Sequence, residues 1–224
     1  MFLQAFVFLE KAPVYECEDP ITKEWVTEDC EPHKGLNFCE DTPDHKVTWR
    51  VDWDSPFSLH NMIEQINYYC ADDIMIGLLG ASFLMGIVIG CSTLTRLGDV
   101  HGRRPIYMLG IVMHLFFMCG ILIVTIDWIC FILVFIFGMS VTARYYVGYT
   151  FNIEMQPKSH YVLVSTTQFV FESLTYLFIC NYFWLVSDNW KLLQIPNFFF
   201  MITGLIFLSQ MPESPRFLIS TRKF

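Results

Sequence analysis

Charged residues are scarce in this chain of 224 residues. Asp, Glu, Lys and Arg make up 16% of it, whereas soluble domains usually carry about 25%. Apolar residues account for 54% and the mean hydropathy is +0.44. The net charge of −8 excludes a nucleic-acid-binding protein, because phosphates would be repelled, and the 17% aromatic content excludes a disordered chain. Much of the chain is therefore expected to lie away from water.

Several chemical signatures are also missing. The sequence has no Gly-rich phosphate loop, no nucleophile–base pair and no zinc-ligand spacing, although His33 and His45 lie near cysteines. We therefore expect neither an enzyme nor a metal or cofactor site.

The few charges are distributed unevenly. Residues 10–73, called the acidic segment below, hold 16 acids and 5 bases, whereas the remaining 160 residues hold 6 acids and 9 bases. The acidic segment therefore carries −11 and the rest of the chain +3. It also contains four cysteines, which predict two disulfides with three possible pairings in an extracytoplasmic loop: Cys17, Cys30, Cys39 and Cys70.

From residue 74 onward, apolar runs are long enough to cross a bilayer, which takes about 20 residues. A soluble bundle is disfavoured because its helices would need polar outer faces. The apolar residues 1–9 lack signal-peptide features, so we interpret them as the end of a truncated first span. We predict an all-α membrane helix bundle with five transmembrane helices, at residues 74–94, 106–126, 128–153, 161–186 and 192–211.

The positions of the basic residues predict the orientation of the spans. Cytoplasmic connections are rich in Lys and Arg. Seven bases fall on one side of the predicted membrane: Arg96, Arg103, Arg104, Lys158, Arg216, Arg222 and Lys223. This side is expected to be cytoplasmic, with the acidic segment on the other side. We expect a multi-pass protein of the plasma membrane.

Three short stretches lie at the expected cytoplasmic ends of the spans: LGDVHGRRP at 97–105, GYTFNIE at 148–154 and PESPRFL at 212–218. Together they resemble the amino-terminal half of a major facilitator superfamily transporter, in the branch shared by sugar porters and organic cation transporters. The cysteine-bearing acidic segment is more similar to organic cation transporters. Thr95 and Val100 depart from the family motif, which usually has Gly and a base there.

The resemblance implies that the chain forms a six-helix half of such a transporter. It also implies a cytoplasmic gating network made by residues of the cytoplasmic segment 212–224 and of the motifs at 97–105 and 148–154. The residues assigned to this network are Asp99, Arg103, Arg104, Glu154, Glu213 and Arg216. In the alternative interpretation, the bases only set the topology. The resemblance places the partner of Asp99 in the carboxy-terminal half, so we expect Asp99 to lack that partner here.

Two ionisable residues lie near the expected membrane midplane, Arg144 and Glu172. Such residues are costly in a bilayer and mark functional sites. We hypothesise that Glu172 and Gln168, with Tyr145 and Tyr149, line a cavity for an organic ion, since a carboxylate and aromatic faces attract cations. The alternative is an Arg144–Glu172 pair that only neutralises two buried charges.

Two further patterns have structural interpretations. Gly86 and Gly90 form a GxxxG stripe with Ser82, which predicts close helix packing inside the bundle or, alternatively, dimerisation. His114 lies at similar depth to Arg144, but the family places its span on the periphery, so we expect it to pack.

Together these features predict half of a secondary active transporter for small organic solutes, either organic ions or sugar-like molecules, that works by alternating access. Its expected partners are the solute, the lipid bilayer, and a missing carboxy-terminal six-helix half or a second subunit. The alternative is a non-transporting structural subunit of a membrane assembly.

Overall fold

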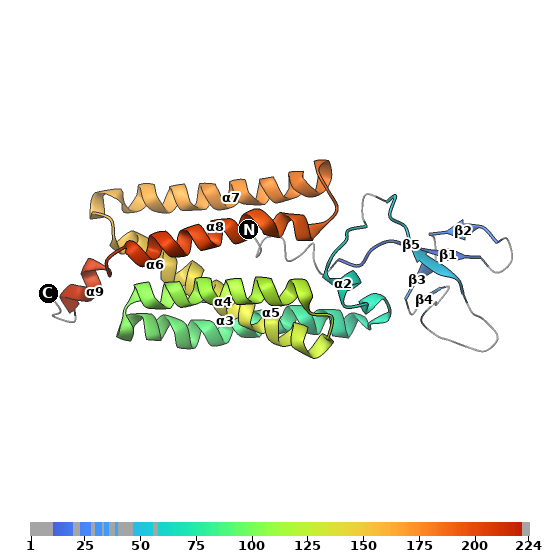
Figure 1. Ribbon diagram of the computed structural model, residues 1–224, viewed down its shortest axis with the longest axis horizontal. Coiled ribbons are helices and arrows are strands. Elements are labelled where there is room, and N and C mark those ends of the chain that lie inside the picture. Colours follow the sequence, from blue (N-terminus) through green and yellow to red (C-terminus); the bar gives the residue numbers. More distant parts are fainter. Residues whose placement is uncertain are drawn as a thin grey trace.

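The computed structural model describes residues 11–19, 23–27, 30–32, 34–35, 39, 47–55 and 58–220. The expectation of a truncated helix at residues 1–9 lies outside these residues, as do His33, His45, Arg222 and Lys223. The described chain forms a bundle of long helices with a small strand-containing part at one end, and the last described helix, α9, lies at the other (Figure 1).

Within the described residues, five helices are long and apolar enough to cross a membrane, which confirms the expected number of such helices. They are α3 (Asp73–His101), α4 (Arg103–Ile123), a composite helix, α7 (Tyr161–Leu185) and α8 (Trp190–Gln210). The composite helix consists of α5 (Asp127–Thr142), η2 (Ala143–Val147) and α6 (Gly148–Glu154). The short η3 (Lys158–His160) precedes α7, and α9 (Pro215–Ser220) follows α8.

Helices α3 and α5 cross at two glycines. A Cβ atom on Gly86 would lie 2.2 Å from the carbonyl oxygen of Phe135, and one on Gly138 would lie 2.2 Å from that of Phe83. A Cβ atom on Gly90 would meet the Thr142 hydroxyl at 2.8 Å. The small-residue stripe of α3 therefore packs inside the bundle against α5, as small residues do when membrane helices approach closely.

The connection between α3 and α4 is shorter than the sequence suggested. Helix α3 continues past the expected end at residue 94 to His101, and α4 begins at Arg103. Only Gly102 separates them, with a φ of 108° that residues with a Cβ atom rarely adopt. The motif at residues 97–105 is therefore two helix ends around one left-handed glycine, and its charges lie on helices.

Arg144 lies in an irregular part of the composite helix. Residues Ala143–Val147 form a π-helical turn between α5 and α6. Such a turn holds one extra residue, so it changes the angular relation between the side chains before and after it, and it often occurs at functional sites. The turn is packed closely against α4, because a Cβ atom on Gly110 would lie 2.6 Å from the Ala143 Cβ atom.

The acidic segment forms two small sheets, and the Cys17–Cys30 disulfide joins them. Strands β2 (Trp25–Val26), β1 (Tyr15–Glu18) and β5 (Trp49–Val51) form an antiparallel sheet in that order, and β3 (Cys30–Glu31) pairs with β4 (Lys34–Gly35). The structure selects one of the three possible pairings, with disulfides Cys17–Cys30 and Cys39–Cys70. Cys70 ends η1 (Tyr68–Cys70), just before α3, so the Cys39–Cys70 disulfide links a residue after β4 to the start of the helix bundle.

The acidic segment contacts the bundle through α2 (Met62–Gln65). Met62 and Ile63 are buried in the main core cluster with residues of α4 and α5. The Gln65 side-chain amide donates hydrogen bonds to two backbone carbonyls at the end of α4, those of Ile121 at 2.5 Å and Val124 at 2.9 Å. This satisfies acceptors that a helix end leaves without intrahelical partners.

Candidate functional site

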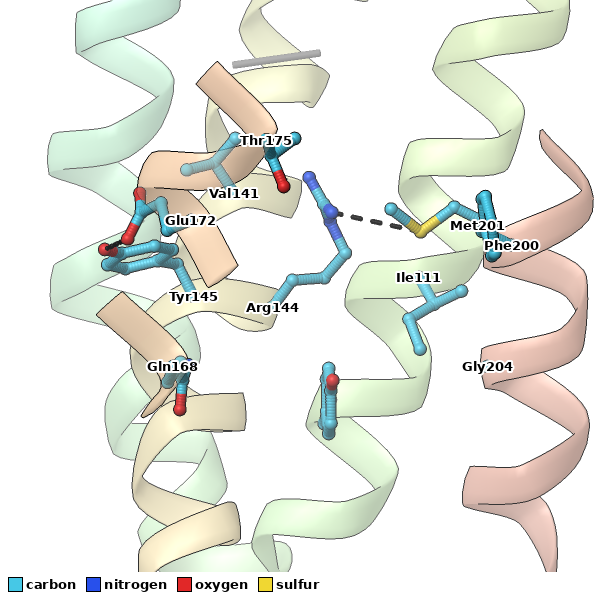
Figure 2. Close-up of a pocket in the computed structure, with 11 residues that line it drawn as sticks. Ile111, Val141, Arg144, Tyr145, Gln168, Glu172, Thr175, Phe200, Met201 and Gly204 are labelled. Atoms are coloured by element: carbon cyan, nitrogen blue, oxygen red, sulfur yellow. Dashed lines mark hydrogen bonds between the residues drawn. The ribbon is translucent and has the colours of Figure 1, made fainter. Parts of the chain in front are cut away.

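A cavity of about 350 Å³ lies within the helix bundle. Residues from α4, α5, η2, α7 and α8 form its wall. They are Tyr107, Ile111, Val141, Arg144, Tyr145, Gln168, Glu172, Thr175, Phe200, Met201 and Gly204. Figure 2 shows that Arg144 and Glu172 approach this space from different helices. A cavity in an apolar bundle with a few convergent polar groups has the general form of a small-molecule site.

The Arg144 side chain extends across the cavity toward α8 (Figure 2). Its Nη1 atom contacts the Met201 sulfur at 3.9 Å, and its Nε atom is buried without a hydrogen-bond partner. The missing side chain of Gly110 leaves room for the Arg144 stem, since a Cβ atom there would lie 3.1 Å from the Arg144 Cγ atom. Among the described residues, no carboxylate oxygen lies within 4.0 Å of the guanidinium.

Glu172 meets Tyr145 on the other side of the cavity. The Tyr145 hydroxyl donates a hydrogen bond of 2.5 Å to Glu172 Oε2 (Figure 2). Glu172 is on α7 and Tyr145 is on η2, so this bond links two membrane helices. The alternative of a direct Arg144–Glu172 ion pair does not hold in this structure, because the two charged groups have different partners within the described residues.

The structure brings together four of the five predicted cavity residues. Gln168 and Glu172, one helical turn apart on α7, line the cavity with Arg144 and Tyr145. Tyr149 does not line it. Its hydroxyl lies 2.9 Å from the Ser165 hydroxyl, so it joins α6 to α7 instead. The reason is the π-helical turn, which alters the direction of the side chains that follow it.

The other seven residues of the cavity wall were not among the predicted ones, and they include Tyr107, Phe200 and Met201. Tyr107 is a polar side chain within an apolar helix, and this signal was available in the sequence. Its ring lies against Gly148, where a Cβ atom would approach it to 2.9 Å. Phe200 and Met201 carry no polar signal that separates them from lipid-facing residues, so only helix packing identifies them.

A second group of charges lies at the end of the bundle that carries residues 97–105 and 212–218, called the motif end below. Glu154 forms an ion pair with Arg103, in which Arg103 Nη1 lies 2.5 Å from Glu154 Oε1. Only 4% of the Glu154 side chain is exposed. The Ser214 hydroxyl donates a 2.8 Å hydrogen bond to Glu154 Oε2 and accepts one from the Phe217 amide at 3.1 Å. Ser214 is fully buried and was not among the predicted residues.

Glu213 and Arg104 bind the ends of neighbouring helices. Glu213 Oε1 accepts hydrogen bonds from the backbone amides of Arg103 at 3.0 Å and Arg104 at 3.1 Å. A carboxylate is stabilised there by the unpaired amides and the positive end of the α4 dipole. The Arg104 guanidinium donates to the carbonyls of Leu208, at 3.3 Å, and Ser209, near the end of α8.

Asp99 and Arg216 lie at the edge of this group. The Asp99 carboxylate, near the end of α3, lies 3.2 Å from Arg103 Nη2 at the start of α4, and the Asp99 side chain is 68% exposed. Arg216 lies 3.8 Å from Glu154 and is 80% exposed, so its ion pair is weak. The structure therefore joins all six predicted network residues through contacts at the motif end, with Arg103 and Glu154 at the centre.

His114 is fully buried in an aromatic cluster of α4 and α5. Its ring lies 5.5 Å from that of Phe137 and 6.2 Å from that of Phe117. It is not among the residues that line the cavity. These contacts fit the expected packing role.

Membrane-capable helices thus surround a cavity that contains Arg144 and Glu172. The sugar (and other) transporter family matches residues 39–224. The chain belongs to this family, which confirms the resemblance to the sugar porter and organic cation transporter branch of the major facilitator superfamily. Membership, together with the five membrane-capable helices of the described residues, indicates a multi-pass integral membrane protein of a transporter family.

Individual relatives support the same assignment. The chain is 26% identical over 178 residues to solute carrier family 22 member 4 of Mus musculus, covering 77% of this chain and 31% of that protein. It is 24% identical over 166 residues to an organic cation transporter protein of Drosophila melanogaster, covering 72% of this chain and 29% of that protein. The chain therefore spans less than one third of these two relatives.

Proposed function

We propose that this chain forms half of a secondary active transporter for small organic ions, which works by alternating access. The observation that carries this proposal is the cavity in which Glu172 and Tyr145 lie together. A carboxylate beside an aromatic ring attracts a cationic group by charge and by cation–π interaction. The names of the organic cation transporter relatives are in accord with a cationic group on the solute.

Neutralising Glu172 tests this proposal. We expect Glu172→Gln to lower the uptake of a radiolabelled quaternary ammonium probe, tetramethylammonium, by about tenfold or more, because one charge-assisted contact is lost. Glu24→Gln is the matched control, since Glu24 is an exposed carboxylate of the acidic segment. Unchanged uptake by Glu172→Gln at equal surface expression contradicts the proposed site. No uptake by the unmodified protein favours the structural-subunit alternative.

We propose that the motif-end network is a latch that holds one conformation of the transporter. Arg103 is on α4, Glu154 ends α6, and Ser214 precedes α9, so their contacts join three parts of the chain. Partly buried ion pairs of this kind have two arrangements, made and broken, and are suited to switching. The low exposure of Glu154 supports this role over one of setting topology alone, which requires no ion pair.

Two double variants separate the latch from a purely topological role. We expect Arg103→Glu alone to reduce uptake strongly. The double variant that combines Arg103→Glu with Glu154→Arg exchanges the two charges and should restore part of the uptake. The control combines Arg103→Gln with Val100→Lys, so that the motif end keeps its basic charge but loses the ion pair. Val100 is chosen because its side chain is exposed and a lysine fits there. Full uptake by this control would contradict the latch.

We further propose that the acidic segment lies outside the cell at the plasma membrane, and that a second helix bundle, on the same polypeptide or another subunit, completes the cavity. Its two disulfides support an extracytoplasmic position, because disulfides persist in oxidising compartments. Labelling of intact cells with a membrane-impermeant amine reagent tests the orientation. Lys23 should react and Lys158 should not; the reverse result contradicts the orientation.

A further inference from the structure

A groove of about 270 Å³ lies between the last turns of α4 and the first turns of α8, at the end of the bundle that carries the strands (Figure 1). It is called the α4–α8 groove below. Ile195 and Phe199, which line it, are exposed, whereas Met118 and Gln194 on its wall are buried. None of its residues lines the cavity that contains Arg144. The groove therefore opens toward the outside of the bundle and is separate from the proposed solute site.

The outer end of the groove lies at the level of a membrane surface. At the same end of the bundle, Trp128 at the start of α5 and Trp184 near the end of α7 are exposed. Exposed tryptophans at helix ends mark the level of the lipid headgroups. From Lys191 to Phe199, α8 advances by about 12 Å at 1.5 Å per residue. Since half of a hydrocarbon core is about 15 Å deep, the groove runs from the headgroups toward the membrane centre.

A lysine without an acidic partner stands at the outer end of this groove. Lys191 is exposed in the first turn of α8, and its side chain lines the groove. Within the described residues, no carboxylate oxygen lies within 4.0 Å of its ammonium group. The helix dipole is positive at this end, so α8 itself does not stabilise the charge. An anion outside the protein would therefore be favoured beside Lys191.

A buried amide follows the lysine, three residues further along α8. The Gln194 side chain lines the groove and is only 2% exposed. Its Oε1 atom accepts a 3.5 Å hydrogen bond from Asn197, whereas its Nε2 atom donates none within the part of the chain that the structure describes. A buried donor without an acceptor is costly. An acceptor on a molecule in the groove would remove this cost.

We propose that the α4–α8 groove binds a phospholipid of the surrounding membrane. From the surface inward, the groove offers an ammonium group, an amide donor and apolar side chains, and a phospholipid carries a phosphate, ester carbonyls and acyl chains in the same order. The phosphate lies at Lys191, an ester carbonyl accepts from Gln194, and one acyl chain lies against Ile195 and Phe199. A sterol has no anion for the lysine. This site is additional to the proposed function and does not depend on it.

Cys119 provides a reporter inside the groove. It is a free and exposed thiol on the groove wall, whereas Cys180 on α7 is a free thiol that does not line the groove. A bound phospholipid should slow the reaction of Cys119 with N-ethylmaleimide and leave that of Cys180 unchanged. Both rates are measured by mass spectrometry of peptides from the purified protein in dodecyl maltoside. The melting temperature of the same samples gives a second measure of binding.

Three lipids with chains of equal length test the two polar contacts. Dioctanoylphosphatidylcholine has the phosphate and the ester carbonyls, its diether analogue lacks the carbonyls, and dioctanoylglycerol lacks the phosphate. We expect the first lipid to protect Cys119 by half at about one fifth of the mole fraction that either analogue requires. A lysine–phosphate contact at a membrane surface, or one neutral hydrogen bond, changes the affinity by about this factor. The melting temperature should rise in the same order.

Variants assign each contact to its residue. Lys191→Gln should remove the preference for phosphatidylcholine over dioctanoylglycerol and keep the preference over the diether, whereas Lys191→Arg should keep both. Gln194→Leu should remove the preference over the diether alone. Lys158→Gln is the matched control, since Lys158 is an exposed lysine between α6 and α7, and it should behave as the unmodified protein.

Four results would overturn the inference. Equal protection of Cys119 by phosphatidylcholine and dioctanoylglycerol in the unmodified protein would exclude a phosphate contact. Equal slowing of Cys180 would show a general effect of added lipid. Failure of Cys119 to react in detergent alone would contradict an open groove. Protection by cholesterol at a lower mole fraction than phosphatidylcholine would assign the groove to a sterol instead.

Discussion

The crossing of α3 and α5 gives a sharp test of how the bundle is held together. We predict that Gly86→Ala destabilises the protein, whereas Gly77→Ala on the same helix does not. A Cβ atom on Gly86 would lie 2.2 Å from the Phe135 carbonyl oxygen and 3.1 Å from the Gly138 Cα atom. Both neighbours are backbone atoms, so no side chain can rotate to make room. At Gly77, no atom lies within 4 Å of the added Cβ atom.

The expected magnitude follows from two opposing contributions. Alanine favours a helix over glycine by about 1 kcal/mol, and this gain is common to both variants. In Gly86→Ala the helices must also separate by about 1 Å or more to restore an ordinary contact distance, which loosens their other contacts. Overpacking of this kind costs about 1–3 kcal/mol. Gly86→Ala should therefore be less stable than Gly77→Ala by about that amount.

Unfolding of the two variants in the same detergent, followed by helical circular dichroism during denaturation, measures this difference. Because the protein spans a membrane, the comparison of variants is more informative than the absolute free energy of unfolding. If Gly86→Ala is as stable as Gly77→Ala, the close crossing of α3 and α5 is wrong. A gain of stability in Gly77→Ala alone would agree with the reasoning.

Three further outcomes are expected. Ser214→Ala should lower stability by about 1–3 kcal/mol, because it leaves a buried carboxylate with one acceptor unmet; in the same thermal unfolding assay the exposed Ser220→Ala should have no effect. Loss of the Cys39–Cys70 disulfide, which spans 31 residues, should cost about 3–4 kcal/mol and increase proteolysis of the acidic segment. Burial raises the pKa of Tyr15 from 10.0 to about 12. The neutral form is thus favoured in the folded state, and stability should fall as the pH rises from 10 to 12, a loss that Tyr15→Phe should reduce.

Much of the fold could be predicted from the sequence because a bilayer imposes a strong pattern. Long apolar runs predicted the membrane-capable helices, and the four cysteines predicted two disulfides without their pairing. The ends of the helices were less predictable. The motif at 97–105 contains polar residues and was therefore taken as a connection, but polar residues also extend a helix beyond the bilayer, and only Gly102 breaks the helix.

The candidate site was predictable only where polarity marked its residues. Arg144 and Glu172 stand out because charges are rare in membrane helices, whereas Phe200 and Met201 do not. Tyr149 carries the same polar signal as Tyr145 but lies beyond the π-helical turn and contacts Ser165 instead of the cavity. Ser214 was missed because a serine in a short polar stretch gives no sign of burial.

The sequence by itself determined the environment of this protein and its family, because hydropathy, cysteine number and the three motifs depend on residue type and order alone. The tertiary structure decided which charges meet. It separated Arg144 from Glu172, joined Glu154 to Arg103 and Ser214, and gave Asp99 a partner on the next helix. Ion pairs and hydrogen bonds require a few ångströms of proximity and a suitable direction, and both depend on how helices distant in the sequence pack together.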